Sequence, residues 1–198
     1  MATDIAAIIR ELLSFYDFTN KTVIAVGAGG GQFATWARAT RKVIAVDSDA
    51  DALARLSETA ERLALADKYE MVAADFQTLE RTGEAVLFEF CLHEIPDPAA
   101  ALRRAKRLAP DVVVIDHAPG SPWAYYTAEE EKVAAEWRAL GSFPLRRSRL
   151  FEAVQAFDDF PALVEKVKPQ GEPSLRRVEA FRGQTTITIP MSYGIAIV

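Results

Sequence analysis

The sequence predicts an α/β fold in which a mostly parallel sheet is covered by helices on both faces. Continuous apolar runs such as Val112–Ile115 suit strands that are buried on both sides. These runs alternate with segments whose apolar residues recur at helical spacing, the pattern of strand–helix–strand units. Three glycines, Gly27, Gly29 and Gly31, follow the first run. The 198 residues are enough for one domain with its own core, and we expect a single domain over residues 1–198.

Strands and helices alternate through the first 118 residues. Apolar residues at helical spacing predict an amphipathic helix over residues 4–16. Further helices are predicted over residues 32–40, around Leu53–Leu63 and over 98–108. The strands predicted between them are residues 22–27, 43–47, 69–74, 85–91 and 112–116. Ligands of such folds bind beyond the carboxyl ends of the strands, so we expect the site at that edge.

The regular alternation stops after Pro119. Helices are predicted over three later segments, residues 127–140, 159–168 and 173–183. The sequence then ends in two predicted strands, residues 185–189 and 193–198, around a turn at Pro190. Residues 119–184 are thus predicted to be a helical insertion before the last two strands. A long insertion at the ligand edge often recognises the substrate, which is the role we expect here.

The glycine-rich segment Gly27–Gly31 indicates a site for a nucleoside cofactor. A strand that enters a glycine turn and then a helix lets backbone N–H groups approach a ligand closely. Asp47 ends the next apolar run, where an acid can hold the two hydroxyls of a ribose. A dinucleotide fingerprint would need a glycine in place of Gln32. A nicotinamide-dependent oxidoreductase is therefore an alternative that the spacing disfavours.

The G-x-G-x-G spacing and the motifs after it resemble the class I methyltransferases, which bind S-adenosylmethionine. Ala74–Phe76 resembles the acidic step after the family's third strand, and Cys91–Glu94 resembles the substrate-facing end of its fourth strand. Asp97–Pro98 and Leu102–Pro110 resemble the stretch before its fifth strand. The resemblance covers about residues 20–118.

This resemblance implies a Rossmann-like fold with a seven-stranded, mostly parallel sheet, and methyl transfer from S-adenosylmethionine. The residues assigned to the cofactor are Gly27, Ala28, Gly29, Gly31, Asp47, Ser48, Asp75 and Phe76. The family usually has an acid two residues before the first glycine, and Ala25 stands there in this chain. Since that acid helps hold the methionine amino group, Ala25 keeps open the alternative of a non-catalytic protein that binds the cofactor or a partner.

The sequence has two histidines, and each follows a predicted strand at the ligand edge. His93 precedes Glu94, while His117 follows Asp116. A hydroxyl or protonated amine must lose a proton when it is methylated, and a histidine suits that task. We therefore predict His93 as the general base, with His117 supporting it or orienting the substrate. Glu94 or Asp116 is predicted to orient an imidazole.

Two other interpretations of the histidines stay open. Each imidazole can simply hydrogen-bond a loop carbonyl at its strand end. The two histidines and their neighbouring carboxylates are also ligands that a divalent ion accepts. Adjacent residues of a strand point to opposite sides, so the four side chains converge only where the strand ends bend, and we expect no metal.

The methyltransferase resemblance implies an acceptor methylated at oxygen or nitrogen, and the charge favours a small molecule over a nucleic acid. The net charge is −5, whereas nucleic-acid binding needs a basic surface, although the segment Arg146–Arg149 is locally basic. Trp123, Tyr125 and Tyr126 are candidates to line a pocket for a flat or cationic substrate, or else they pack the insertion onto the body. The single cysteine, the absence of a signal pattern and the absence of a long apolar stretch indicate the cytoplasm and no membrane partner.

Overall fold

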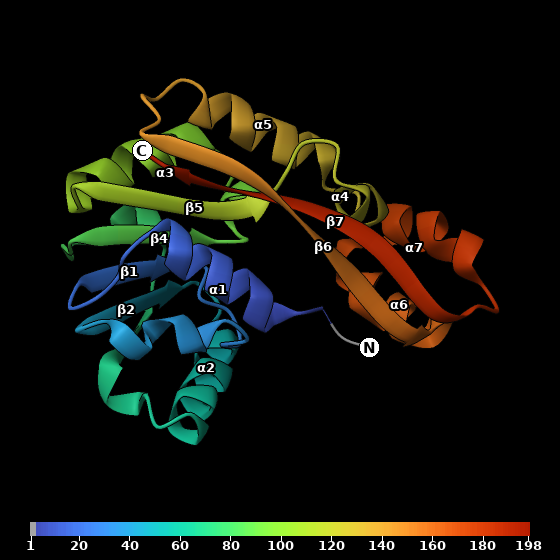
Figure 1. The fold of residues 1–198 in the computed structure, drawn as a ribbon, viewed down its shortest axis with the longest axis horizontal. Helices are drawn as coiled ribbons and strands as arrows, with labels where there is room; N and C mark the ends of the chain where they lie inside the picture. Colours follow the sequence, from blue (N-terminus) through green and yellow to red (C-terminus); the bar gives the residue numbers. More distant parts are fainter. Residues whose placement is uncertain (1–2) are drawn as a thin grey trace.

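Residues 3–198 of the computed structural model form a seven-stranded sheet with helices on both faces (Figure 1). The strand order is β3-β2-β1-β4-β5-β7-β6. The first five strands are parallel to one another, and β7 runs antiparallel to both of its neighbours. The strands are β1 Thr22–Val26, β2 Lys42–Asp47, β3 Tyr69–Ala73, β4 Ala85–Glu89, β5 Asp111–His117, β6 Arg147–Asp159 and β7 Thr185–Ile197. The predicted mostly parallel sheet of seven strands is confirmed.

Seven α-helices surround the sheet in the described part of the chain. They are α1 Ile5–Phe15, α2 Ala50–Arg62, α3 Pro98–Leu108, α4 Pro122–Tyr126, α5 Glu130–Leu140, α6 Phe160–Val167 and α7 Glu172–Val178. Short 3-10 helices are η1 Ala34–Ala39, η2 Ala66–Lys68, η3 Phe76–Thr78, η4 Leu92–Glu94, η5 Lys168–Gln170 and η6 Glu179–Phe181. Across residues 3–198, none of these helices has the length and hydropathy that a bilayer crossing requires.

The parallel strands β1, β2, β4 and β5 are buried on both faces, which explains their continuous apolar runs, whereas the edge strand β3 is only half-buried. In β1, Val23 and Ala25 belong to the core beneath α1 and α2. The alternate residues Ile24 and Val26 belong to the core beneath α3. The carboxyl ends of the strands lie outside these two cores. Loops form the surface at that edge of the sheet.

Three predicted elements differ locally from the structure. The helix predicted over residues 32–40 is the 3-10 helix η1. The fourth strand ends at Glu89 because Phe90 adopts a φ of +50°, outside the extended region. The helix predicted over residues 127–140 is α5, which begins only at Glu130 because Ala128 adopts a φ of +60°; the short helix α4 before it was not predicted.

The strands after β5 require a larger correction. Residues 147–159, which the sequence pattern places in a helical insertion, form β6 and pair with β7 along its length. The closing antiparallel pair is therefore β6 with β7, and the predicted strands 185–189 and 193–198 are parts of the single strand β7. Most side chains of β6 are exposed or half-buried, so this edge strand lacks the apolar alternation that identifies a strand in sequence.

Pro190 lies inside β7, opposite Val154 of β6, where a turn is predicted from the sequence. Only residues 193–197 of β7 pair with β5, so the strand has β6 as its single neighbour at Pro190. A missing N–H is tolerated where a strand is paired on one side only. The β6–β7 ribbon thus continues past the end of β5, with α6 and α7 against its far part (Figure 1).

We predict that Gly194→Ala lowers the free energy of unfolding by about 1–3 kcal/mol, the usual cost of overpacking a filled core. A Cβ at Gly194 would lie 2.3 Å from Cη2 of Trp137. Gly141→Ala is the matched control, because its Cβ would meet no atom closer than 3.4 Å. Urea unfolding measures both variants, and equal midpoints would contradict the prediction.

Candidate functional site

The glycine turn after β1 is shaped by close contact with the segment after β4. Gly27 has a φ of +63°, and a Cβ on it would lie 2.4 Å from Cβ of Cys91. The thiol of Cys91 donates to the carbonyl of Val26 at 3.0 Å, which joins the two segments. A side chain at position 27 would therefore separate β1 from β4 at the edge where the ligand is expected.

Asp47 holds the glycine turn from the neighbouring strand. Its Oδ2 accepts the N–H of Gly29 at 3.1 Å, and its Oδ1 accepts the N–H of Asp49 at 2.9 Å. The carboxylate lies at the end of β2, as predicted, and is only partly buried. It can therefore accept further hydrogen bonds from the hydroxyls of a ligand.

A first cavity of about 760 Å³ lies beside the turn. The predicted cofactor residues that line it are Gly27, Asp47, Ser48, Asp75 and Phe76. Its apolar lining includes the buried Phe76, Val26 and the partly buried Ile95. Ala28 and Gly31 lie instead beside a much smaller cavity. A lining that combines apolar side chains with carboxylates suits a nucleoside.

Glu89 is an acid that the sequence analysis missed, and it lies close to Ala25. It is the last residue of β4, and both residues line that much smaller cavity. Its Oε2 accepts the indole N–H of Trp36 at 3.0 Å. Burial raises the pKa of Glu89 to about 7, against the effect of that hydrogen bond. The glycine turn therefore has a carboxylate nearby although β1 carries none.

A second cavity of about 430 Å³ lies at the ends of β4 and β5. The predicted residues His93, Glu94 and His117 all line it. Residues 119–184 contribute further lining residues, which are Trp123, Thr127, Glu129, Gln155, Ala156, Phe157, Lys166 and Gln170. Glu94 lines both cavities, so the two are adjacent at this residue.

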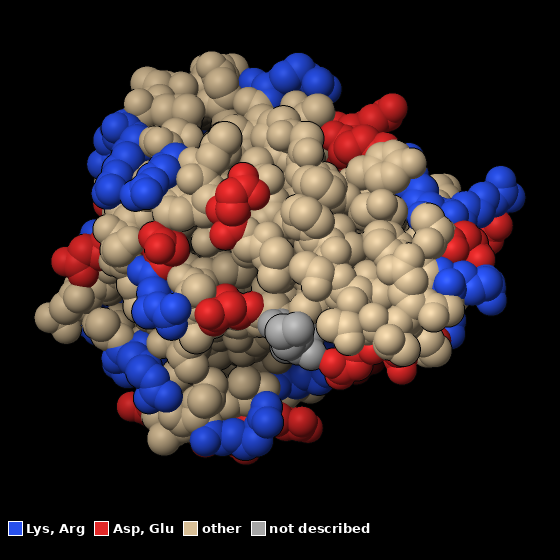
Figure 2. Space-filling view, turned by 45° about the vertical axis from the view of Figure 1, so that its right-hand side comes forward, with Lys and Arg blue, Asp and Glu red and all other residues tan. Residues whose placement is uncertain are grey.

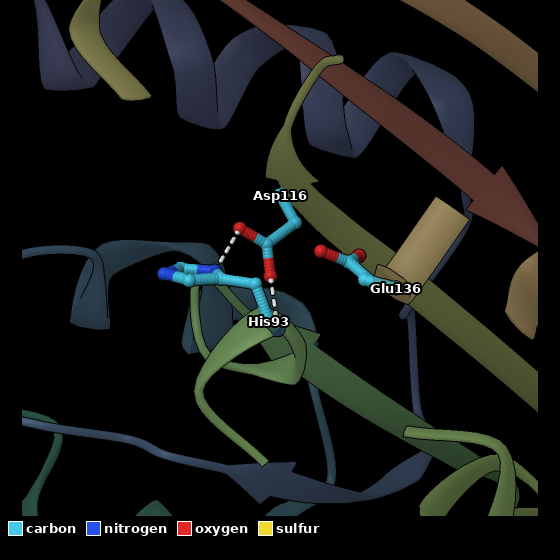
Figure 3. Close-up of side chains that lie close together, drawn as sticks. All are labelled: His93, Asp116 and Glu136. Atoms are coloured by element: carbon cyan, nitrogen blue, oxygen red, sulfur yellow. Dashed lines mark hydrogen bonds and ion pairs between the residues drawn. The ribbon is translucent and has the colours of Figure 1, made fainter. Parts of the chain in front are cut away.

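His93 is held by Asp116 from the neighbouring strand (Figure 3). Nδ1 of the imidazole lies 2.6 Å from Oδ1 of Asp116, and the backbone N–H of His93 donates to Oδ2 at 3.3 Å. Asp116 is fully buried and also accepts the N–H of His117 at 2.8 Å. The pair leaves Nε2 of His93 directed away from Asp116 (Figure 3). Of the two acids predicted to orient an imidazole, Asp116 makes the direct hydrogen bond.

Nε2 of His93 lies between two carboxylates. It is 3.5 Å from Oε1 of Glu94 and 3.8 Å from Oε2 of Glu129. Burial lowers the pKa of His93, but the hydrogen bonds to Asp116 and Glu94 and the charge of Glu129 outweigh burial and raise it to about 10. His93 is therefore an imidazolium at neutral pH.

The imidazole of His117, unlike that of His93, is uncharged. Burial lowers its pKa to about 4, against the attraction of Asp116, so the ring is neutral at neutral pH. The Phe90 ring lies 5.1 Å away between centroids, and the backbone carbonyl of His117 accepts the indole N–H of Trp137 at 2.7 Å. Nδ1 of His117 is buried and has no hydrogen-bond partner among residues 3–198. It is a polar atom that a ligand can satisfy.

Two further buried acids, Glu129 and Glu136, were not found from the sequence. Glu129 precedes α5 and accepts the hydroxyl of Thr127 at 2.7 Å; burial raises its pKa to about 7, and Glu94 adds to the rise. Glu136 points toward Asp116 (Figure 3), and neither of its oxygens has a hydrogen-bond partner within the described residues 3–198. Burial, with the charge of Asp116, raises the pKa of Glu136 well above its usual value. The spacing Val133–Glu136–Leu140 places this acid on the apolar side of α5, which is a signal that sequence could have provided.

The acids bring together atoms that a metal could use. Ligand atoms of His93, Glu94 and Glu129 lie within 4.8 Å of one another. The strand-alternation argument against convergence does not hold there, because both His93 and Glu94 belong to η4 and not to β4. Lys132 already pairs with Glu94 at 2.7 Å, and Thr127 with Glu129, so the carboxylates have partners within the chain.

The other candidate groups divide between cavity and surface. Trp123 is buried, lines the second cavity and stacks on Phe157 at 5.7 Å between centroids. Tyr125 is half exposed beneath the guanidinium of Arg177. The basic segment Arg146–Arg149 lies outside both cavities, and its arginines contact Asp111 and aromatic rings of the chain itself.

Comparison with known proteins places this arrangement among methyltransferases. A family model described as a methyltransferase domain matches residues 1–167. No curated protein matches the chain in sequence.

Solved structures have the same fold. A proposed methyltransferase from Bacillus halodurans aligns with a TM-score of 0.72 and 16% identity, over 96% of this chain and 97% of that chain. The YcgJ protein of Bacillus subtilis gives a TM-score of 0.72 and 11% identity over 97% of both chains. A SAM-dependent methyltransferase from Aquifex aeolicus gives a TM-score of 0.60 and 18% identity, over 96% of this chain and 88% of that chain. At these identities the likeness shows a shared fold.

We predict that NMR of the imidazole rings finds His93 charged and His117 neutral at pH 8. Asp116→Asn should lower the pKa of His93 from about 10, because it removes a charge that favours the imidazolium. Asp67→Asn, at an exposed acid, is the control and should change neither ring. A neutral His93 at pH 8 in the wild type would contradict the assignment.

Proposed function

This chain belongs to the methyltransferase domain family, and from that premise we propose that it methylates oxygen or nitrogen of a small-molecule acceptor. It is an S-adenosylmethionine-dependent enzyme. The observation that carries the proposal is that Glu94 lines both cavities and His93 lines the second. One cavity would hold the nucleoside of the cofactor and the other the acceptor.

The residues of the first cavity fit the cofactor. Asp47 has the position and free hydrogen-bonding capacity for the ribose hydroxyls, and Phe76 offers a flat surface for the adenine, with Ser48 and Asp75 also lining the cavity. The glycine turn leaves room that a side chain would fill, as the contact at Gly27 indicates. S-adenosylmethionine supplies a methyl group on a positively charged sulfur, so the protein has to provide alignment and a proton acceptor.

We assign proton removal to His93, oriented by Asp116, with Glu94 beside it. His93 accepts a proton only in its neutral form, and with a pKa of about 10 roughly one molecule in a thousand is neutral at pH 7. The neutral ring is then a strong base. His117 is neutral throughout this range and would orient the acceptor through Nδ1. The proposed reaction uses no metal ion.

The size of the second cavity and the surface charge support a small molecule as acceptor. A volume of about 430 Å³ is typical of small-molecule sites. Figure 2 shows acidic and basic side chains interspersed on the visible face, with no continuous basic stretch for a nucleic acid. We infer that residues 119–184 recognise the acceptor, because Trp123, Glu129 and Phe157 line the cavity. We also propose that the enzyme acts in the cytoplasm, without a nucleic-acid or membrane partner.

Calorimetric titration should give micromolar binding of S-adenosylmethionine and S-adenosylhomocysteine, and none of NAD. Asp47→Ala should weaken binding at least tenfold because it removes the ribose acceptor. Gly29→Val should do the same because Gly29 has a φ of +53°. Asp51→Ala, at an exposed acid outside the cavity, is the control. Full affinity in both site variants would refute the cofactor site, and NAD binding would favour an oxidoreductase.

Turnover should rise with pH between 7 and 10, because the neutral fraction of His93 rises over that range. His93→Ala should lower turnover about 100-fold or more and leave cofactor affinity unchanged. Asp116→Asn should move the rising limb to lower pH. The measurement is release of S-adenosylhomocysteine with a panel of phenols, alcohols and amines. Unchanged turnover in His93→Ala would remove His93 as the base.

A further inference from the structure

The acids near the second cavity differ in the cations that they contact, although Lys166 also lines this cavity. His93 is charged, but the buried carboxylate of Asp116 already compensates it at 2.6 Å. Glu94 pairs with Lys132 at 2.7 Å. Glu129 has a hydroxyl, that of Thr127, as its close partner, and the nearest cationic nitrogen among the described residues is Nε2 of His93 at 3.8 Å. Glu129 is therefore the acid of this cavity that pairs with no Lys or Arg side chain among the described residues, and its pKa of about 7 leaves it partly ionised at neutral pH.

Burial makes this lack of a Lys or Arg partner costly. Glu129 is 5% exposed, and a carboxylate withdrawn from water needs a cation or several hydrogen bonds. It lines a cavity that is large enough for a ligand. A cationic ligand would give Glu129 the close ionic partner that no described Lys or Arg side chain provides.

A second, independent observation concerns His117. It lines the same cavity, is 7% exposed, and its Nδ1 has no hydrogen-bond partner among residues 3–198. In the tautomer with the proton on Nε2, Nδ1 of the neutral ring accepts a hydrogen bond. A ligand that satisfies both His117 and Glu129 must therefore donate at least two hydrogen bonds. A primary ammonium group has three N–H donors, whereas a hydroxyl has one.

The remaining walls suit the body of such a ligand. Four aromatic side chains line the cavity, and they are Phe33, Phe90, Trp123 and Phe157. Aromatic faces attract cations and pack against apolar groups. The cavity thus combines an acidic end, an unsatisfied acceptor and apolar rings.

We propose that the methyl acceptor is an amine with an aromatic or apolar body, whose ammonium group binds Glu129 and His117. This rests on the proposed function and narrows it from oxygen or nitrogen to nitrogen. Glu129 determines specificity, and His93 remains the base. The ammonium N–H proton passes to Nε2 of neutral His93. The freed nitrogen lone pair then forms the N–CH₃ bond as the S–CH₃ bond breaks, and the sulfur keeps that electron pair in S-adenosylhomocysteine.

The test compares amines with the alcohols of the same shape. Benzylamine, 2-phenylethylamine and tryptamine are each titrated beside benzyl alcohol, 2-phenylethanol and tryptophol, into the full-length protein with saturating S-adenosylhomocysteine and a chelator at pH 7.5. At least one amine should bind tenfold or more tightly than its alcohol. Glu129→Gln should remove that preference by weakening the amine about tenfold and leaving the alcohol within twofold. Glu131→Gln removes the same charge from an exposed neighbour on α5, and it should leave the preference intact.

The outcomes separate this proposal from the proposed function. Binding of S-adenosylhomocysteine with no amine preference in any pair would overturn the amine assignment alone. Equal weakening of amine and alcohol by Glu129→Gln would also overturn it, because Glu129 would then only shape the cavity. A wild-type protein that does not bind S-adenosylhomocysteine would overturn the proposed function and this inference together.

Discussion

The hydrogen bond between Asp116 and His93 organises the end of the sheet on which the second cavity depends. Asp116 is fully buried, and burial alone would raise its pKa, yet the hydrogen bond and charge of His93 keep that pKa low. The carboxylate accepts three N–H groups, two from His93 and one from the backbone of His117. It thereby connects the segment after β4 to the end of β5 and determines which nitrogen of His93 faces the cavity.

The glycine turn connects to the same segment from the other side. Gly27 packs directly against Cys91, which precedes His93 by two residues. The cofactor side and the acceptor side are therefore built on one short stretch of chain, Phe90–Glu94. The left-handed φ of Phe90 ends β4 early and turns this stretch across the edge of the sheet. His93 and Glu94 can face one space because η4, and not an extended strand, carries them.

Acids dominate the chemistry of both cavities. Asp116, Glu94, Glu129 and Glu136 surround one imidazolium, and their different surroundings separate their charge states. Glu94 has its pKa lowered by His93, whereas burial raises that of Glu129 and Glu136. Glu89 adds a carboxylate near the glycine turn, close to where the family usually has an acid and this chain has Ala25. Asp116 and Glu94 are ionised beside His93, whereas burial favours the neutral form of Glu136.

The sequence by itself determined the parallel part of the fold, the glycine turn with Asp47 and the position of both histidines. These features follow from local patterns: apolar runs, glycine spacing and residues at strand ends.

Tertiary structure decided the rest. β6 is an exposed edge strand, and only its pairing with β7 identifies it as a strand. Pro190 indicates a turn in the sequence, but it fits inside β7 because β5 does not pair with β7 at that position. Glu129 lies 36 residues after His93, and their contact depends on how α4 and α5 fold over β5. The charge states of His93 and His117 depend on burial and on distances to acids from other elements, which no local pattern contains.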